Sequence, residues 1–391
     1  MAPMDTKRVV VTGIGAVAAP GIGIDEIWKG LIGGPAHVGP HVIEDWDPDP
    51  IIPLRESRRL DKFTQYALVA ADEAIRQAGD FVDDPNRVTI AVATGIGGLE
   101  SLEILVNGSQ EEEPRVSPFS VPMMMANAAA AAISIKYGYG GQANTPVVAC
   151  AAGSQSVLDG MRQIQWGYAD VAIVGGSEAA ARRPAREGFK AARALSKSGV
   201  ARPFDVDRDG FVMGEGGAIL VLESLEHAQA RGATILAEVL GGASTADAYH
   251  ITAPHPEGDG AERAMRLALA DAGLDEKDVT YINAHGTGTD LNDRTEGLVV
   301  ERIFGSKQPA VSSIKGTTGH GLGASGSIEA AIVVQSMIRG ELLPNIGLEN
   351  QDPEIPLTDI VVEVRDWTPA PTLSSSFGFG GHNTVLAFAP F

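Results

Sequence analysis

Apolar and small residues recur at the spacing of one helical face in two separate parts of the chain. Residues 61–79 form the first of these amphipathic segments and residues 260–273 the second, and both end in Ala-Gly. A glycine directly after the last turn is typical of a helix C-terminus. Each segment is followed by a loop and a short apolar run, at 88–93 and 279–284, which indicates a buried β-strand. The two helix–strand units therefore predict an internal repeat.

A strand followed by a helix of small residues also occurs twice. The sequence predicts a strand at 145–149 before a helix at 151–166, and a strand at 310–314 before a helix at 323–338. Strands that alternate with helices are typical of α/β domains, and we expect mainly parallel sheets that are buried on both faces. Active sites of such folds lie at the carboxyl ends of the strands.

These repeats predict two α/β halves that join near residues 223–236. We expect an N-terminal half at residues 1–230 and a C-terminal half at residues 231–391. A chain of 391 residues is long for one simple core, so two units packed together fit its length.

The charge of the chain restricts its partners. Its 50 acidic residues outnumber its 30 lysines and arginines, which gives a formal charge of −20 and a pI near 4.8. Such a surface as a whole repels nucleic acid and anionic membranes. Residues 1–11 lack the apolar core of a signal peptide, and the apolar stretch 121–135 is shorter than the about 20 residues of a membrane span. We therefore expect a buried helix at 121–135 and a cytoplasmic protein with no membrane or nucleic-acid partner.

Cys150 is the only cysteine, which excludes an intramolecular disulfide and fits a reducing compartment. A lone cysteine is ordinarily an inert buried residue. This one, however, stands between a predicted strand and a helix that begins Ala-Ala-Gly-Ser. Unpaired N–H groups and the macrodipole of a helix N-terminus favour the thiolate, and small neighbours leave the sulfur accessible. Cys150 is therefore a candidate nucleophile.

Two histidines and a lysine follow strands of the second half. His285 follows the apolar run and precedes the loop Gly-Thr-Gly-Thr, whose small hydroxyl residues suit a polar, extended ligand, although taken alone it is an ordinary loop histidine. Lys315 and His320 lie in the stretch Lys-Gly-Thr-Thr-Gly-His. A lysine at the end of a buried strand is costly unless its charge is used, either in catalysis or in a structural pair with Glu329 or Asp293.

A second glycine-rich loop, Ser-Phe-Gly-Phe-Gly-Gly-His-Asn, occupies residues 376–383. Glycine alternating with phenylalanine suggests a hinge that carries an aromatic plug, with backbone N–H groups free to bind an oxyanion. A plain tight turn is the alternative.

Cofactor motifs are weak or missing. Residues 9–18 match a dinucleotide fingerprint, but Pro20 and two further glycines interrupt the helix that should hold the pyrophosphate, which argues against nicotinamide binding. No cysteine–histidine cluster and no His-Glu-x-x-His motif indicates a metal, so we expect none.

Four motifs, in this order, resemble those of the beta-ketoacyl-acyl-carrier-protein synthases. They are Ala149-Cys150-Ala151-Ala152, Asn283-Ala-His285-Gly-Thr287, Lys315-Gly-Thr-Thr-Gly-His320 and Ser376-Phe-Gly-Phe-Gly-Gly-His-Asn383. The similarity runs from Val9 to the last strand and is greatest with the elongating enzymes, including the ketosynthases of type II polyketide systems. The resemblance implies an α/β, thiolase-like fold with two similar halves in five α/β/α/β/α layers. It also implies a homodimer, or a heterodimer with a chain-length-factor-like subunit.

The resemblance implies an acyltransferase and a catalytic role for each motif. Cys150 takes an acyl chain from the phosphopantetheine arm of an acyl carrier protein, with no permanently bound cofactor. His285 and His320 stabilise the enolate that forms when malonyl-carrier protein loses carbon dioxide, and this Claisen condensation gives 3-oxoacyl-carrier protein. Lys315 positions and tunes His320. The backbone N–H groups of Cys150 and Phe379 form the oxyanion hole.

Further positions are carried over as binding residues. Those expected to bind substrate are Thr287, Thr289, Phe377 and Phe379, of which the threonines bond the pantetheine and Phe379 gates entry. Carrier proteins are acidic, so their encounter with an acidic chain requires a local basic patch. The arginines that match the docking face of the family are Arg55, Arg58, Arg59 and Arg202; solvated surface arginines are the alternative.

Departures from the family pattern leave the pathway open. The loop between Ser196 and Arg202 is shorter than is usual for elongating enzymes, and the residues that flank Cys150 are not the most common ones. Acyl length, unsaturation, fatty acid or polyketide product, and homodimer or heterodimer are therefore not determined.

Three related classes of protein fit less well. A degradative thiolase needs a second active-site cysteine, and this chain has one cysteine. Initiating synthases use Cys-His-Asn, whereas the second site here is a histidine. Chain-length-factor-like subunits lack the nucleophile that Cys150 supplies.

Overall fold

The structure is a computed structural model that describes residues 6–33, 36–110 and 116–391 of the chain. Residues 1–5, the first part of the segment predicted to lack a signal peptide, lie outside the described residues.

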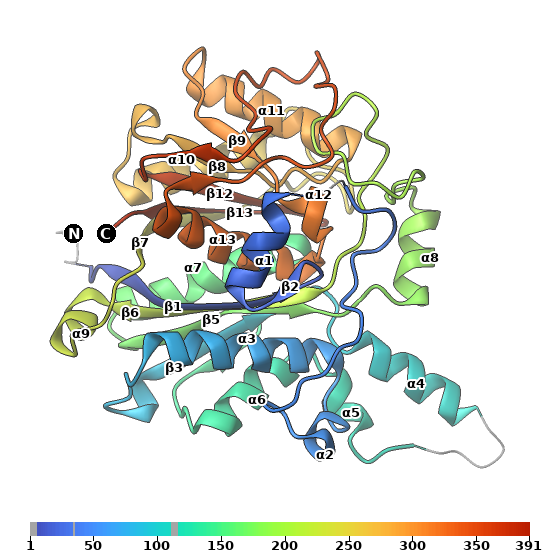
Figure 1. Cartoon of the computed structure of the whole chain (residues 1–391), viewed down its shortest axis with the longest axis vertical. Helices are drawn as coiled ribbons and strands as arrows, with labels where there is room; N and C mark the ends of the chain where they lie inside the picture. The colour runs from blue at the N-terminus through green and yellow to red at the C-terminus, as the bar shows by residue number, and fades with distance from the viewer. Residues whose placement is uncertain (1–5, 34–35, 111–115) are drawn as a thin grey trace.

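Two layers of strands with the same order, joined into one hydrogen-bonded sheet through β1 and β7, organise the molecule (Figure 1). The strands of the first half are β1 (Val9–Ala18), β2 (Gly21–Ile22), β3 (Val88–Ala93), β4 (Ala143–Asn144), β5 (Val171–Glu178) and β6 (Gly216–Ser224). The strands of the second half are β7 (Ala237–Ala246), β8 (Tyr281–Asn283), β9 (Ala310–Ser312), β10 (Glu341–Leu342), β11 (Arg365–Asp366), β12 (Thr372–Gly378) and β13 (His382–Ala389). The hydrogen-bonded order β4-β3-β5-β6-β1 of the first sheet is repeated by β9-β8-β12-β13-β7 in the second. The predicted internal repeat is confirmed.

Helices lie between the sheets and on both outer faces. The helices of the first half are α1 (Ile24–Ile32), α2 (Leu54–Ser57), α3 (Lys62–Ala78), α4 (Leu99–Ser109), α5 (Ser120–Met124), α6 (Ala128–Tyr137), α7 (Ala152–Gln165), α8 (Arg183–Ala191) and α9 (Leu225–Ala230). Those of the second half are α10 (Asp259–Ala272), α11 (Asp290–Phe304), α12 (Lys315–Thr318) and α13 (Ser325–Arg339). Short 3₁₀ turns occur at Pro85–Arg87, Ala149–Ala151, Glu276–Asp278 and Leu322–Ala324.

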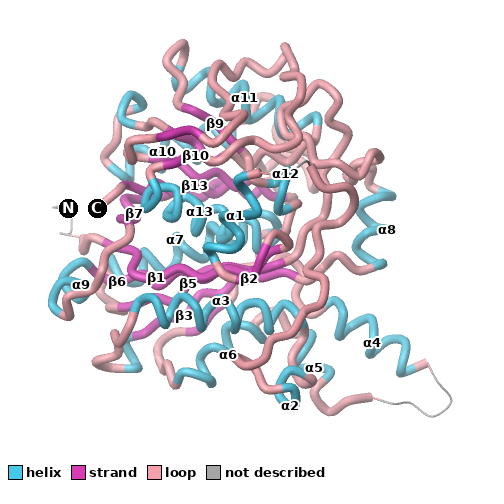
Figure 2. The backbone as a smooth tube through the Cα atoms, viewed as in Figure 1, coloured by secondary structure: helices cyan, strands magenta, loops and turns pink. Residues whose placement is uncertain are grey.

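The elements stack in five layers, as the resemblance implies (Figure 1). Helices α3 and α6 cover the outer face of the first sheet, α7 and α13 lie between the sheets, and α10 and α11 cover the second sheet. Figure 2 shows the same alternation as helical and extended backbone. The sheets meet where β1 pairs antiparallel with β7 along three residue pairs, from Val9↔Val239 to Val11↔Ala237.

The two central helices touch through glycines. A Cβ added to Gly153 of α7 would lie 2.5 Å from the backbone nitrogen of Ser327, and one added to Gly326 of α13 would lie 2.3 Å from Ser154 Oγ. Larger residues at these positions would force the helices apart. The close contact brings the N-terminal ends of α7 and α13 to one point between the halves.

The sheets are mixed, so the expectation of mainly parallel sheets is wrong. β3 pairs parallel with β4 and β5, and β8 pairs parallel with β9 and β12. In contrast, β6 and β13 are antiparallel to their neighbours on both sides. Helical periodicity in the sequence reveals the helices that connect parallel strands. It therefore predicts only the parallel part of each sheet.

Two predicted elements of the first half are also wrong. The strand expected at 145–149 is present only as β4, just before it, because Pro146 has no N–H to offer a sheet and the chain then leaves the edge. The helix expected at 121–135 is split into α5 and α6, and its apolar residues Val121 and Ile135 are exposed. No helix of the described residues is long and apolar enough to span a membrane.

Candidate active site

Cys150 lies where the chain turns from the edge of the first sheet into α7. The 3₁₀ turn Ala149–Ala151 leads directly into this helix, and Ala149 has a left-handed φ of 50°. A positive φ is strained for alanine, and such strain is concentrated where a functional group must be presented at a sharp turn. Cys150 is 7% exposed and lines a cavity of about 410 Å³. The structure thus places the candidate nucleophile at a helix N-terminus, as the sequence predicts.

The thiol of Cys150 is nevertheless protonated at rest. Burial raises its pKa to about 11, while the backbone N–H of Phe379, the charge of Lys315 and its own backbone N–H lower it. The expectation that the helix N-terminus would favour the thiolate is therefore wrong, because desolvation outweighs the favourable dipoles. Both predicted oxyanion-hole donors, the N–H groups of Cys150 and Phe379, act at the sulfur.

Gly378 allows the second half to approach the nucleophile. A Cβ at this position would lie 3.0 Å from the backbone oxygen of Val148 and 3.1 Å from the backbone nitrogen of Cys150. The end of β12 therefore rests against the turn that carries Cys150, which brings the N–H of Phe379 to the sulfur. The ring of Phe379 lies 6.1 Å from that of Phe189, between ring centroids.

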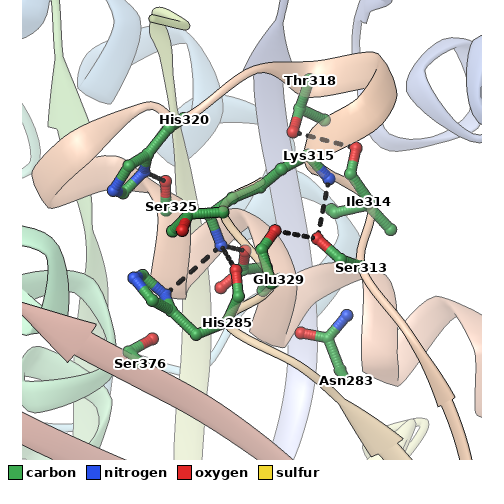
Figure 3. A network of polar contacts seen from close by, with 12 residues as sticks. Asn283, His285, Ser313, Ile314, Lys315, Thr318, His320, Ser325, Glu329 and Ser376 are labelled. Atoms are coloured by element: carbon green, nitrogen blue, oxygen red, sulfur yellow. Dashed lines mark hydrogen bonds and ion pairs between the residues drawn. The ribbon is translucent and has the colours of Figure 1, made fainter. Parts of the chain in front are cut away.

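Lys315 is buried between His285 and Glu329 (Figure 3). Its Nζ donates to the backbone oxygen of His285 at 2.6 Å, lies 3.4 Å from Nδ1 of the same residue, and forms a hydrogen-bonded ion pair with Glu329. Of the two structural partners that the sequence left open, Glu329 is the one found. An ammonium group can only donate, so Nδ1 of His285 accepts and the imidazole proton is on Nε2.

The prediction that Lys315 positions His320 is wrong about the contact. Lys315 begins α12, and its side chain extends to His285 and Glu329 and not to His320 (Figure 3). His320 Nδ1 lies instead 2.9 Å from Ser325 Oγ, and the backbone of His320 bonds to Val212 and Gly214. Lys315 still affects His320 through its charge, which lowers the pKa of that imidazole.

The two imidazoles face one another as neutral groups. The ring centroids of His285 and His320 lie 5.3 Å apart at an interplanar angle of 82°. Burial lowers the pKa of both rings well below the usual value, and the charge of Lys315 lowers them further. Each ring therefore carries a single N–H at neutral pH. Two such donors beside a cysteine can stabilise an oxyanion without transferring a proton to it.

One cavity joins the predicted groups from both halves. Cys150, His285 and His320 all line it. The four predicted substrate-binding residues line it as well: Thr287, Thr289, Phe377 and Phe379. Lys315 does not line the cavity and lies behind His285, so it acts on the chemistry through its neighbours.

Two buried carboxylates of α11 hold the loop after β8. Glu296 accepts the N–H groups of His285 and Gly286, each at 2.8 Å, and Asp293 accepts that of Thr287 at 3.0 Å. Burial raises the pKa of Glu296 to about 7. Sequence reasoning did not identify Glu296, and it considered Asp293 only as a partner of Lys315. The sequence did contain a signal for this pair, because Asp293 and Glu296 lie three residues apart, on one side of a helix that follows a glycine loop.

None of the four predicted docking arginines lines the cavity. Arg55, Arg58 and Arg59 are exposed on α2 and the turn after it, at the lower edge of Figure 1. Arg202 pairs with Glu349 at 3.3 Å instead. The docking face formed by these four residues stays a prediction.

Two family models match most of the chain. The model described as "Beta-ketoacyl synthase, N-terminal domain" matches residues 50–228, and "Beta-ketoacyl synthase, C-terminal domain" matches residues 236–349. The chain is 44% identical to the 3-oxoacyl-[acyl-carrier-protein] synthase 2 of Synechocystis sp., with 100% of each chain covered. It is 43% identical to the protein of the same name from Staphylococcus aureus, with 98% of this chain and 99% of the relative covered.

Solved structures agree with these matches. The ishigamide ketosynthase/chain length factor superposes with a TM-score of 0.93 at 34% identity and covers 99% of this chain and 100% of its own. A ketosynthase in complex with its type II PKS acyl-carrier protein, bound to the hexaketide, superposes with a TM-score of 0.89 at 30% identity, again over 99% and 100% of the two chains.

Proposed function

The chain belongs to the beta-ketoacyl synthase family, and we propose that it is a 3-oxoacyl-acyl-carrier-protein synthase that uses Cys150 as its nucleophile. The observation that carries the proposal is that Cys150, His285 and His320 line one cavity, although they come from different halves of the chain. A thiol next to two neutral N–H donors is the set that thioester exchange followed by enolate formation requires.

In the first step, Cys150 is acylated. Its sulfur attacks the thioester carbonyl of an acyl chain on the phosphopantetheine arm of a carrier protein, and the arm leaves as a thiol that takes up the proton lost by Cys150. The backbone N–H groups of Cys150 and Phe379 hold the oxyanion of the tetrahedral intermediate. Each such donor is ordinarily worth about 3 kcal/mol of transition-state stabilisation.

In the second step, malonyl-carrier protein enters the cavity. Its carboxylate leaves as carbon dioxide, and the bond electrons form an enolate whose oxygen accepts the N–H groups of His285 and His320. The enolate carbon attacks the acyl group on Cys150, which gives 3-oxoacyl-carrier protein and a cysteine thiolate. A proton taken up from solvent returns Cys150 to its resting thiol, whose pKa of about 11 favours this state.

The surrounding groups hold these reactants in place. Lys315, paired with Glu329, fixes the tautomer of His285 so that Nε2–H points away from the lysine. Thr287 and Thr289, whose hydroxyls lie 2.9 Å apart, bond the pantetheine arm in the cavity. Phe379 gates the entry of the second substrate, and Phe377 packs on the ring of His285.

Substrates arrive on the phosphopantetheine arm, and the enzyme holds no permanent cofactor. It works in the cytoplasm, in fatty-acid or type II polyketide synthesis, as a homodimer or with a chain-length-factor-like subunit. The exposed edge at β4 and the 51% exposed Val147 beside it support such an association. The two halves meet near residue 230, between the two matched models.

Substitution of the two histidines tests this function. His285→Ala and His320→Ala should still transfer an acyl chain to Cys150, seen as a mass increase of the protein, but should lose decarboxylation of malonyl-carrier protein by at least about a hundredfold. His37→Ala, at an exposed histidine that does not line the cavity, is the matched control and should keep both activities. Histidine variants that condense at the wild-type rate, or a Cys150 that never acquires an acyl group, would contradict the proposal.

A further inference from the structure

Glu178 is a buried acid that the proposed mechanism does not use. It is the last residue of β5 and is 0% exposed. Its carboxylate accepts four hydrogen bonds, from the backbone N–H groups of Gly95 at 2.6 Å, Gly323 at 3.2 Å and Ile96 at 3.3 Å, and from the hydroxyl of Thr94 at 3.1 Å. Burial raises the pKa of Glu178 to about 7, while these bonds lower it. The side chain therefore holds backbone from two distant segments of the chain.

The four donors suit a carboxylate and not a protonated acid. Backbone N–H groups can only donate, and the hydroxyl of Thr94 accepts the N–H of Gly97 at 3.1 Å, so its own proton points to Glu178. A proton on Glu178 would find no acceptor among these four groups. An amide NH2 in place of one carboxylate oxygen would likewise set a donor against donors. The contacts therefore depend on both oxygens of Glu178.

Glu178 joins the two halves of the chain. Gly95 and Ile96 lie in the loop after β3 of the first half, whereas Gly323 belongs to the 3₁₀ turn Leu322–Ala324 of the second half. A Cβ added to Gly323 would lie 2.1 Å from the backbone nitrogen of Gly95, so the two loops are in direct contact. A larger residue at position 323 would force them apart. The glycine thus allows one carboxylate to bind both loops.

The loops that Glu178 holds form a wall of the active-site cavity. Ile96 and Leu322 both line the cavity together with Cys150. Leu322 also packs in the apolar cluster that contains Cys150 and Phe211. It has a left-handed φ of 46°, and a strained backbone of this kind persists only where the surrounding contacts fix it. The bond from the N–H of Gly323, the next residue, to Glu178 is one such contact.

We propose that Glu178 is a positioning residue for acyl transfer, which fixes Ile96 and Leu322 as an apolar wall against which the acyl chain on Cys150 lies. The inference rests on the proposed function, because only an enzyme that carries an acyl chain on Cys150 presents such a chain to this wall. Glu178 does not line the cavity, so it acts through the backbone that it holds. A longer chain buries more apolar surface against the wall, so the effect of Glu178 should increase with chain length.

Substrates of two chain lengths test this role. Glu178→Gln keeps the size of the side chain but removes its charge and one acceptor. In this variant, kcat/KM for transfer of a decanoyl group from its carrier protein to Cys150 should fall at least about tenfold. Transfer of an acetyl group, which presents little surface to the wall, should stay within about threefold of wild type.

The reactivity of Cys150 toward a small reagent provides a second readout. Burial raises the pKa of Cys150, and the charge of Glu178 raises it further. Alkylation of Glu178→Gln by iodoacetamide at pH 8 should therefore be about threefold faster than that of wild type. A small reagent and a long acyl chain should thus respond in opposite directions, whereas a general loss of structure would not distinguish decanoyl from acetyl transfer.

Glu223→Gln is the matched control. Glu223 is also 0% exposed, and it lies on β6 beside the opposite end of β5 from Glu178. Its side-chain partners, none of which lines the cavity, are Thr12, His227 and Arg231. This control removes an equally buried charge, and it should keep the wild-type ratio of decanoyl to acetyl transfer.

The ratio of the two transfers decides the proposal. An unchanged ratio in Glu178→Gln, or the same change of ratio in Glu223→Gln, would overturn it. An equal loss with both chains would also overturn it, because Glu178 would then support the fold or the thiol and not the acyl chain. If Glu178→Gln does not fold, Thr94→Val removes one of the four donors and keeps the charge, and it should lower decanoyl transfer more than acetyl transfer. Wild type that transfers neither acyl group would instead refute the proposed function.

Discussion

Removal of Lys315 separates its structural role from its positioning role. Lys315→Met keeps most of the aliphatic chain but deletes the ammonium group that bonds to His285 and Glu329. The side chains of Lys315 and Glu329 are 2% and 1% exposed, so the carboxylate of Glu329 would remain in a dry site without a counter-charge. Loss of one partner of a buried ion pair ordinarily costs about 3–5 kcal/mol of the free energy of unfolding.

The cost should depend on pH in a defined direction. Burial raises the pKa of Glu329 to about 7 even with Lys315 present, and without the lysine it must rise further. A carboxyl whose folded pKa exceeds its unfolded value of 4.5 contributes most to stability below pH 4.5, and that contribution is lost as pH rises through the folded pKa. The variant should therefore be much less stable than wild type at pH 8 and closer to it at pH 6.

Urea unfolding at the two pH values, together with a malonyl-decarboxylation assay, provides the measurement. Lys315→Met/Glu329→Gln removes the buried charge, so most of the stability lost at pH 8 should return. Decarboxylation should stay about a hundredfold down in both variants, because neither holds the tautomer of His285. Recovery of decarboxylation in the double variant would refute the positioning role of Lys315. A single variant as stable as wild type at pH 8 would refute the buried ion pair.

Two further predictions concern the nucleophile. Alkylation of Cys150 by iodoacetamide should accelerate about tenfold for each pH unit between pH 7 and pH 9, because only the thiolate reacts and the pKa of the thiol is about 11. Mass spectrometry of the alkylated protein measures this rate. A rate that levels off below pH 9 would contradict the conclusion that burial raises the pKa of Cys150. Gly378→Ala should slow acyl transfer to Cys150 about tenfold, because the new methyl group, only 3.0 Å from the backbone oxygen of Val148, shifts the end of β12, and with it the N–H of Phe379, away from the sulfur. An unchanged transfer rate would show that this N–H does not stabilise the oxyanion.

Local patterns in the sequence predicted the parts of the fold that depend on local contacts. The helix periodicity of 61–79 and 260–273 corresponds to α3 and α10, each of which ends at a glycine, as expected. The antiparallel pairing of β6 and β13 could not be predicted, because it depends on neighbours that are distant in the sequence. The strand expected at 145–149 failed for a related reason: β4 lies at a sheet edge, and apolar composition alone does not distinguish an edge from a core.

The members of the site were predictable, whereas their protonation states and contacts were not. Cys150 and His285 were candidates from the residues around them, His320 was assigned from the family resemblance, and all three line the cavity. The direction of the pKa shift of Cys150 was wrong, because a helix N-terminus is visible in a sequence but the desolvation of a buried sulfur is not. The partner of Lys315 depends on the path of a long side chain between two loops, which spacing along the chain does not report.

The protonation state that burial imposes suits the second half-reaction. Decarboxylation moves negative charge from the malonyl carboxylate to the enolate oxygen. Groups that bind the carboxylate as strongly as the enolate would lower the free energy of the ground state and of the transition state equally, and would not accelerate the reaction. A charged imidazolium would form an ion pair with the carboxylate and would also protonate the enolate before it attacked. The lowered pKa of His285 and His320 leaves two uncharged N–H donors, which gain most when the oxygen becomes anionic. Lys315 contributes to this state because its charge, placed behind His285 and paired with Glu329, keeps both rings neutral without itself reaching the cavity.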